Sequence, residues 1–208
     1  MSACPAILIS GFTAAGKTTH ARLLAEDLGW AYLGLSGIRR ELLGHGTGAE
    51  PSGAEWEPAL DQLRSCNPGL DVTADRVMAQ RIAAVRDPVV VDAWLQPWLS
   101  GRAGAVRVWL ASDHQSRLRK AAVTFLRRGM QPPDGLAQEV RQKDRFSVEQ
   151  FRSLYGIRFG PDAGLFDLLI DNSGCIRAAS IPASDEGIAA FRPVFRSAVT
   201  SLLLRKVS

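Results

Sequence analysis

The sequence predicts an α/β fold of three layers, in which a five-stranded parallel sheet lies between two layers of helices. Short apolar runs alternate along the chain with longer segments of helical periodicity. The runs are continuously apolar, which is typical of strands that are covered on both faces. A glycine-rich segment, GFTAAGKT, follows the first run directly. Because parallel strands are joined through crossover helices, this alternation indicates a doubly wound sheet.

The first quarter of the chain predicts two strands and two helices in alternation. Residues 6–10 (AILIS) are the apolar run of a central strand, and residues 17–28 carry alanine and leucine at helical spacing before a glycine. A second strand is expected at 30–35, followed by a short helix over 36–43 that its first residue, a serine, caps. The glycines and prolines of residues 44–58 predict a loop.

The middle of the chain continues the alternation. Residues 71–85 have helical periodicity with Asp71 as the expected cap, and PVVVD at 88–92 is a buried strand that ends on a carboxylate. The next strand is expected at 106–111. A basic helix follows over 112–128, with its first residue, a serine, as the expected N-cap, before a glycine- and proline-rich break.

The last part of the chain predicts two helices and one strand. Residues 136–155 form a long, highly charged helical pattern, residues 166–170 form the last core strand, and residues 185–204 form an amphipathic helix. The sequence contains no internal repeat. A chain of 208 residues with this composition suits one domain.

The charge balance limits the classes of function. Lys and Arg number 25 and Asp and Glu number 21, so the formal net charge is +4 at pH 7. The basic residues gather between residues 117 and 158 among acidic ones, which suits a small polyanion at least as well as a long nucleic acid. No apolar run reaches about 18 residues, and the N-terminus lacks the basic region of a secretory signal. We therefore expect a cytoplasmic protein without membrane or long nucleic-acid partners, whose scattered cysteines and histidines form no disulfide framework or metal cluster.

The strongest signal is residues 11–18 (GFTAAGKT), which fit the phosphate-binding pattern G-x-x-x-x-G-K-[ST] in full. Glycines permit backbone angles that a Cβ forbids, so that the N–H groups of such a loop converge on phosphate oxygens. In such loops the lysine, here Lys17, reaches the β- and γ-phosphates, and the hydroxyl of Thr18 binds Mg²⁺. An inert glycine-rich turn is the alternative. We predict that ATP is bound by Gly11, Thr13, Ala14, Ala15, Gly16, Lys17, Thr18 and Thr19.

Four further segments carry a family resemblance. Residues 32–42 (YLGLSGIRREL) are similar to Y-L-S-x-G-[DE]-I-[FL]-R-E-L, and residues 89–95 (VVVDAWL) are similar to V-[IV]-[IVL]-[DE]-G-R. The segments at 68–76 and 139–173 follow the same family. Together with the phosphate loop they resemble the P-loop nucleoside monophosphate kinases, most closely the cytidylate kinases, over roughly residues 5–173. This resemblance implies a P-loop NTPase core with the strand order 2-3-1-4-5.

The resemblance also implies an acceptor site. Arg40 falls on the arginine that holds the acceptor phosphate, a task that suits a planar and permanently charged guanidinium. Trp94 stands where the cytidylate kinases have an arginine, and with Trp56 and Trp98 it either stacks on a base or packs the lobe. Asp92, at a strand end beside the phosphate loop, binds Mg²⁺ through water, takes the proton of the acceptor, or merely pairs with the loop lysine. The expected acceptor-binding residues are Ser36, Arg40, Arg76, Asp92 and Trp94.

A lid of arginines completes the implied site. Arg141 and Arg145 are four residues apart and share a helix face, with Asp144 placed to orient them. Positioned arginines neutralise the charge that develops on the transferred phosphoryl group, and closure of a lid excludes water. Arg128 begins the lid and is expected to contact ATP; a solvated charged face is the alternative. The expected catalytic residues are Lys17, Asp92, Arg141 and Arg145.

The sequence therefore predicts one ATP- and Mg²⁺-dependent kinase domain, monomeric or homodimeric, with a small acceptor. The acceptor that the resemblance favours is a pyrimidine nucleoside monophosphate such as CMP. A hydroxyl kinase of the same fold is the alternative that Trp94 favours, and a non-catalytic nucleotide-binding module is opposed by the intact loop. The domain of residues 1–208 divides into a core at 1–35, 86–128 and 160–208, an acceptor-binding lobe at 36–85 and a lid at 129–158.

Overall fold

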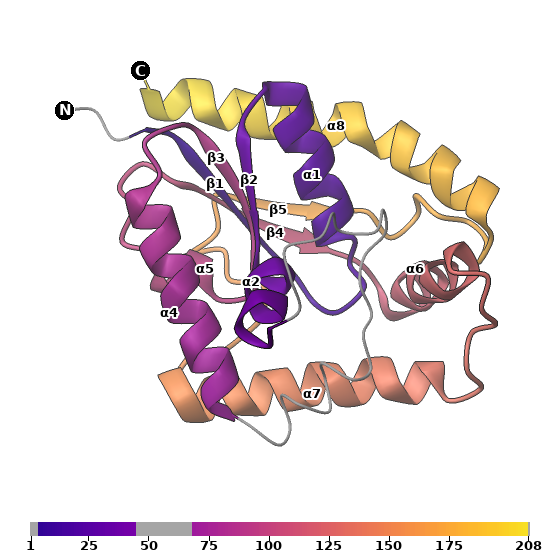
Figure 1. Cartoon of the computed structure of the whole chain (residues 1–208). Coiled ribbons are helices and arrows are strands. Elements are labelled where there is room, and N and C mark those ends of the chain that lie inside the picture. The colour runs from indigo at the N-terminus through magenta and orange to yellow at the C-terminus, as the bar shows by residue number, and fades with distance from the viewer. Residues whose placement is uncertain (1–3, 45–67, 208) are drawn as a thin grey trace.

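The computed structural model describes residues 4–44 and 68–207 and places five parallel strands in one sheet (Figure 1). The order across the sheet is β2-β3-β1-β4-β5, which confirms the expected order 2-3-1-4-5. Gly34 and Ile9 both lie opposite Asp92 in the register, so the carboxyl ends of three strands meet at one edge. The strands are β1 (Ala6–Ser10), β2 (Ala31–Gly34), β3 (Val89–Asp92), β4 (Val106–Ala111) and β5 (Leu168–Asp171).

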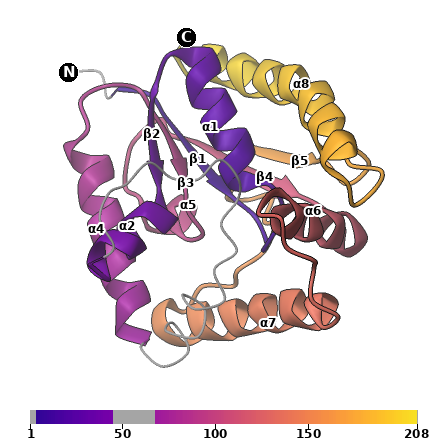
Figure 2. The ribbon, with the colours of Figure 1, turned by 45° about the vertical axis from the view of Figure 1, so that its right-hand side comes forward.

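Helices connect the strands and cover both faces of the sheet. Figures 1 and 2 show α8 and α7 on opposite sides of the sheet. Helix α1 lies beside α8, and α4 lies beside the C-terminal end of α7. The helices of the described residues are α1 (Lys17–Leu28), α2 (Leu35–Leu42), α4 (Pro68–Ala84), α5 (Gln96–Leu99), α6 (His114–Arg127), α7 (Leu136–Tyr155) and α8 (Ile181–Val207). This arrangement confirms the three-layer α/β fold.

The central strand β1 divides its side chains between two cores. Ile7 and Ile9 pack with α1 and α8 on one face, and Ala6 and Leu8 pack with α2 and α4 on the other. All four side chains are fully buried, because successive side chains of a strand point to opposite faces and helices cover both. The edge strands differ from this expectation of full burial: Leu169 of β5 is 45% exposed, since an edge strand has a neighbour on one side alone.

An aromatic cluster fixes α7 against the sheet. Trp109 of β4 is 1% exposed and packs edge-on against Phe159 and Phe166, and Phe151 of α7 packs edge-on against Phe159. Trp98, which follows β3, also packs edge-on against Phe166, at a centroid distance of 5.1 Å. Aromatic pairs in this geometry stabilise a core beyond their buried area. The cluster therefore holds the C-terminal part of α7, at Phe151, against the central sheet.

Two helix starts in the acceptor-side segment differ from the sequence prediction. The N-cap of α2 is Gly34, with no side-chain hydrogen bond, so the expectation that Ser36 caps the helix was wrong: Ser36 lies inside it. Helix α4 begins at Pro68, so Asp71 lies in its first turn and is not its cap.

Other element boundaries also differ. The N-cap of α6 is Asp113, whose carboxylate accepts a hydrogen bond of 2.6 Å from the Ser116 N–H, and not Ser112. A carboxylate at this position also interacts favourably with the positive end of the helix dipole. Strand β5 begins two residues later than predicted because Phe166 belongs to the aromatic cluster. Helix α5 was not predicted, since four residues are too few for a periodic pattern.

Helix α8 is the described helix that is long and apolar enough to cross a membrane, judged by length and composition alone. This criterion tolerates charged residues, and the helix contains Asp185 and Arg192, so it is not the uninterrupted apolar run that the sequence prediction excluded. Phe191, Phe195 and Val199 of α8 are nonetheless buried in the core that β1 and α1 form. The apolar face of this helix therefore packs against the sheet.

Candidate active site

The phosphate loop, residues 11–16, joins β1 to α1 at the carboxyl edge of the sheet. Gly11 is required because an added Cβ would lie 2.5 Å from the carbonyl oxygen of Leu110 on the neighbouring strand. Gly16 is the N-cap of α1 with φ +92°, a left-handed conformation that favours glycine. No side chain caps this helix, so its first N–H groups are directed to the loop, where they suit an anion. Between β1 and the first turn of α1 lie the predicted ATP-binding residues Gly11, Thr13, Ala14, Ala15, Gly16, Lys17, Thr18 and Thr19.

Lys17 turns its ammonium back onto this loop. Its Nζ donates hydrogen bonds to the carbonyl oxygens of Gly11 at 2.9 Å and Phe12 at 3.0 Å. Burial lowers the pKa of Lys17 to about 8, and the carboxylates of Asp92 and Asp144 oppose this shift. The lysine is therefore a desolvated cation whose charge is offset by two nearby carboxylates.

Asp92, at the end of β3, is an acidic group beside the first turn of α1. Its Oδ2 accepts a hydrogen bond of 2.5 Å from the Thr18 hydroxyl and a longer one, 3.5 Å, from the Tyr32 hydroxyl. Burial raises the pKa of the Asp92 carboxyl, while Lys17 and these hydroxyls act in the opposite direction. The tyrosine approaches because residue 34 is a glycine: an added Cβ there would lie 2.5 Å from the Tyr32 oxygen.

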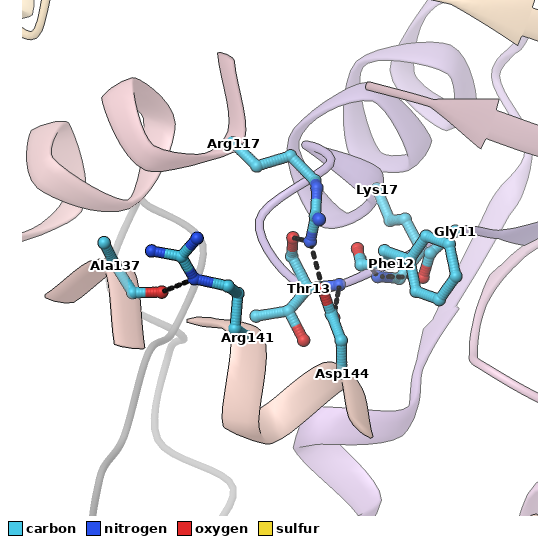
Figure 3. A network of polar contacts seen from close by, with 8 residues as sticks. All are labelled: Gly11, Phe12, Thr13, Lys17, Arg117, Ala137, Arg141 and Asp144. Atoms are coloured by element: carbon cyan, nitrogen blue, oxygen red, sulfur yellow. Dashed lines mark hydrogen bonds and ion pairs between the residues drawn. The ribbon is translucent and has the colours of Figure 1, made fainter. Parts of the chain in front are cut away.

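A second carboxylate reaches the loop from α7. The Thr13 N–H donates to Asp144 Oδ1 at 3.1 Å, and Arg117 Nη1 of α6 donates to Asp144 Oδ2 and to the Thr13 carbonyl oxygen (Figure 3). The guanidinium of Arg117 also lies 5.5 Å from the centre of the Phe12 ring. Arg117, which the sequence reasoning missed, contacts the backbone of the phosphate loop.

The predicted lid arginines lie elsewhere. Arg141 is exposed, and its Nε donates to the carbonyl oxygen of Ala137 on its own helix at 3.2 Å. Figure 3 shows its guanidinium turned away from Lys17. Arg145 is exposed on α7, and Arg128 is exposed at the end of α6. In this arrangement Asp144, and not the arginines beside it, connects α7 to the phosphate loop.

On the acceptor side, Arg39 is buried, and it directly precedes Arg40, the arginine that was predicted to bind the acceptor phosphate. Arg39 Nη2 forms an ion pair of 2.6 Å with Asp71 Oδ1, and the Asp71 side chain is fully buried. The guanidinium of Arg39 also lies over the ring of Trp94, 4.6 Å from its centre. Arg40 is half-buried and Arg76 is exposed. The site therefore contains a cation beside residue 94, supplied from α2.

A further polar cluster links three helices behind this ion pair. The Tyr155 hydroxyl of α7 donates to Asp75 Oδ2 of α4 at 3.0 Å, and the Gln96 Nε2 of α5 donates to the carbonyl oxygen of Asp75 at 3.1 Å. Asp75 is 3% exposed, so its carboxylate is another buried charge on the acceptor side. Ser36 is half-buried in α2. The expected loop beyond Gly44, together with Trp56, His45 and Cys66, lies outside the described residues.

The loop that follows β5 contacts the phosphate loop through Asn172. Its Nδ2 donates to the Ala15 carbonyl oxygen at 2.9 Å, and its Oδ1 accepts a hydrogen bond from Lys120. Lys120 also donates to the Ser112 hydroxyl at 2.7 Å, and burial lowers the pKa of this lysine to about 8. These bonds hold Asn172 and the loop around it against the phosphate loop.

The donor set at Thr18 and Asp92 fits Mg²⁺. Their oxygens lie 2.5 Å apart at the phosphate loop, and Mg²⁺ in kinases is bound by one or two protein oxygens together with phosphates and water. Within residues 4–44 and 68–207 no three His, Cys, Asp or Glu side chains form a metal-binding group. The two oxygens therefore suit a metal that arrives with a nucleotide.

The comparisons with known proteins agree with this geometry. No protein-family model matches the chain. The chain is 29% identical over 167 residues to a cytidylate kinase of Pyrobaculum aerophilum, covering 80% of this chain and 83% of that protein. It is 27% identical over 167 residues to a cytidylate kinase of Ignicoccus hospitalis, covering 80% and 89% of the two chains.

Solved structures share the fold. A putative kinase from Chloroflexus aurantiacus matches with a TM-score of 0.55 at 14% identity, covering 97% of this chain and 98% of that one. A shikimate kinase from Acinetobacter baumannii in complex with shikimate matches with a TM-score of 0.51 at 16% identity, covering 93% and 94%. The likeness to cytidylate kinases supports an ATP-dependent kinase whose sequence is similar to the cytidylate kinases, and the solved structures show the same fold.

Proposed function

We propose that the chain transfers the γ-phosphoryl group of ATP to a pyrimidine nucleoside monophosphate such as CMP. The observation that carries this proposal is the position of Arg39, whose guanidinium lies 4.6 Å from the centre of the Trp94 ring. The cytidylate kinases carry an arginine where this chain has Trp94, and Arg39 supplies a cation beside that position. A guanidinium suits a phosphate because it is planar and binds two oxygens at once.

The phosphate loop forms the part of the site that binds ATP, the phosphoryl donor. Its N–H groups and the ammonium of Lys17 bind the β- and γ-phosphates of ATP, and Lys17 must exchange its loop carbonyls for phosphate oxygens. Thr18 and Asp92 hold Mg²⁺, which, when bound, neutralises charge on the phosphates. Arg141 and Arg145 stabilise the transferred group, as the resemblance implies, which requires that α7 move.

The acceptor side is formed by the segment at 36–85. Arg40 binds the acceptor phosphate with Arg39, and Asp92 lies at the strand end where the acceptor meets the loop. The remaining expected contacts come from Ser36 and Arg76, and Arg128 serves the nucleotide at the start of a lid at 129–158. We also propose that the enzyme acts in the cytoplasm on small molecules, as a monomer or a homodimer.

A hydroxyl kinase of the same fold is the second candidate, and one observation favours it. The carboxylates of Asp71 and Asp75 are buried on the acceptor side, at 0% and 3% exposure. Asp71 offsets the charge of Arg39 through their ion pair, and carboxylates accept hydrogen bonds from hydroxyl groups. In that case Asp92 would take the proton of the attacking hydroxyl.

An ADP-release assay with ATP, Mg²⁺ and matched acceptor pairs separates the two functions. CMP against cytidine, and UMP against uridine, differ in the phosphate alone. The proposal expects turnover with a monophosphate and a kcat/KM at least about 100-fold lower for its nucleoside, because the arginines would then have no phosphate to bind. Turnover of nucleosides or sugars, with none of any monophosphate, would establish the hydroxyl kinase instead. Lys17→Ala, with the loop otherwise intact, is expected to abolish either activity.

A further inference from the structure

The phosphate loop binds a carboxylate of its own chain. Thr13 N–H donates to Asp144 Oδ1 at 3.1 Å, and Arg117 Nη1 donates to Asp144 Oδ2 (Figure 3). A loop N–H and a guanidinium are the groups that bind phosphate oxygens in nucleotide sites. Asp144 therefore makes the kind of contact that a phosphate of ATP makes with such a loop.

The contact is well shielded from water. Thr13 is 6% exposed and Arg117 is 8% exposed, and the side chain of Asp144 is 14% exposed. Hydrogen bonds between charged groups are stronger in such surroundings than in water. A ligand that takes the place of Asp144 must therefore compensate for a substantial interaction.

Two further contacts of Arg117 show which member of this network can separate from the loop when a ligand binds. Arg117 Nη1 also donates to the Thr13 carbonyl at 3.1 Å, and its guanidinium lies 5.5 Å from the ring of Phe12. Phe12 packs edge-on against Trp109 of the central sheet at 5.3 Å. Arg117 and the loop are thus fixed to the sheet together, and Asp144 on α7 is the member of the network that can leave.

We propose that Asp144 is a built-in competitor of the polyphosphate of ATP, and that its release from Thr13 and Arg117 couples nucleotide binding to movement of α7. The contact is autoinhibitory, because part of the binding free energy of the nucleotide is used to displace it. The same displacement frees the part of α7 before Phe151, which carries the exposed Arg141 and Arg145, to move toward the loop. The inference rests on the ATP-dependent kinase activity and is independent of the identity of the acceptor.

The variant Asp144→Asn tests the competition. The amide retains the size of the carboxylate but lacks the charge that pairs with Arg117. The matched control is Glu149→Gln, which removes one negative charge from an exposed position of the same helix. Calorimetry without any acceptor would measure the Kd of ATP and of inorganic tripolyphosphate. Asp144→Asn is expected to lower both Kd values about tenfold, as the loss of one competing charged hydrogen bond predicts, and Glu149→Gln by less than about twofold.

The opposite result has a clear meaning. If Asp144→Asn leaves both Kd values unchanged or raises them, Asp144 supports the loop and does not compete, and the proposal is overturned. Should the variant not fold, wild-type protein titrated with tripolyphosphate gives the answer through the amide resonance of Thr13 and the carboxyl ¹³C resonance of Asp144. Both are expected to shift on saturation, and a carboxyl resonance that does not move would overturn the proposal. Failure of CMP as acceptor leaves these binding results unaffected.

Discussion

The hydroxyl of Thr18 donates a hydrogen bond to the carboxylate of Asp92, with Oγ1 and Oδ2 2.5 Å apart. The pair joins the first turn of α1 to the end of β3, and so joins the phosphate loop to the strand beside the expected acceptor. Asp92 is 6% exposed, so an unpaired charge there would be costly, and the hydroxyl supplies a partner. With a nucleotide bound, Thr18 and Asp92 would be the residues that hold Mg²⁺, which would neutralise charge on the phosphates.

Asp92→Asn is predicted to lower kcat by about 100-fold or more, whether the carboxylate binds the metal or takes a proton. If it serves the metal, the Mg²⁺ concentration for half-maximal rate should rise about 10- to 100-fold. The measurement is the initial rate of ADP release against Mg²⁺ at saturating ATP. Asp87→Asn, an exposed carboxylate just before the same strand, is the control. A kcat for Asp92→Asn within threefold of wild type would contradict this role.

The buried pair of Arg39 and Asp71 is predicted to be a stability element as well as part of the acceptor site. Arg39→Met should lower the free energy of unfolding by about 3–5 kcal/mol, because it leaves the fully buried carboxylate of Asp71 without this cation. Replacing both partners, Arg39→Met with Asp71→Leu, should recover most of that loss. Urea unfolding of the two single variants and the double variant measures the coupling. Additive losses would show that the two side chains do not depend on each other.

The phosphate loop could be predicted residue by residue because all its signals are local. An apolar run, glycines at fixed positions and a helical pattern follow one another within a short stretch, and the structure places β1 and α1 at the predicted bounds. The strand order was predicted with it, through the resemblance and the crossover rule. By contrast, no pattern within a short stretch of sequence shows which of Arg39 and Arg40 is buried beside Trp94. This depends on the rotation of α2, which begins at Leu35 and not at Ser36.

The burial of Arg117 could have been predicted from the spacing of the residues in its helix. Arg117, Ala121 and Phe125 are four residues apart, and all three are buried on one face of α6. An arginine in the apolar register of a helix indicates a buried partner for its charge. The identity of that partner, Asp144, is set by the packing of α7 onto the loop, which no local pattern shows.

Stability is predicted to fall in mild acid because of His20. The side chain is 4% exposed and packs edge-on against Phe191 at 4.8 Å, and burial lowers its pKa to about 4. The unfolded chain, with a histidine pKa near 6.5, takes up the proton first, so this contribution is complete above pH 6.5 and is lost as the pH falls toward 4. The loss approaches roughly 3 kcal/mol below pH 4. Urea unfolding from pH 7 to pH 4 should show a steeper decline for wild type than for His20→Leu; equal slopes would refute this.

Gly34→Ala is predicted to damage the site through Tyr32. An added Cβ would lie 2.5 Å from the Tyr32 hydroxyl and 3.0 Å from its Cζ, so the ring must move away from Asp92. Overpacking of this kind costs about 1–3 kcal/mol, and here it also removes the hydroxyl that lies 3.5 Å from Asp92 Oδ2. Because the closest atom is the hydroxyl oxygen, Tyr32→Phe in the same chain should recover part of the lost stability, but not the hydrogen bond. Thermal unfolding and kcat of the single and double variants test this, and a double variant no more stable than Gly34→Ala would show that the strain lies elsewhere.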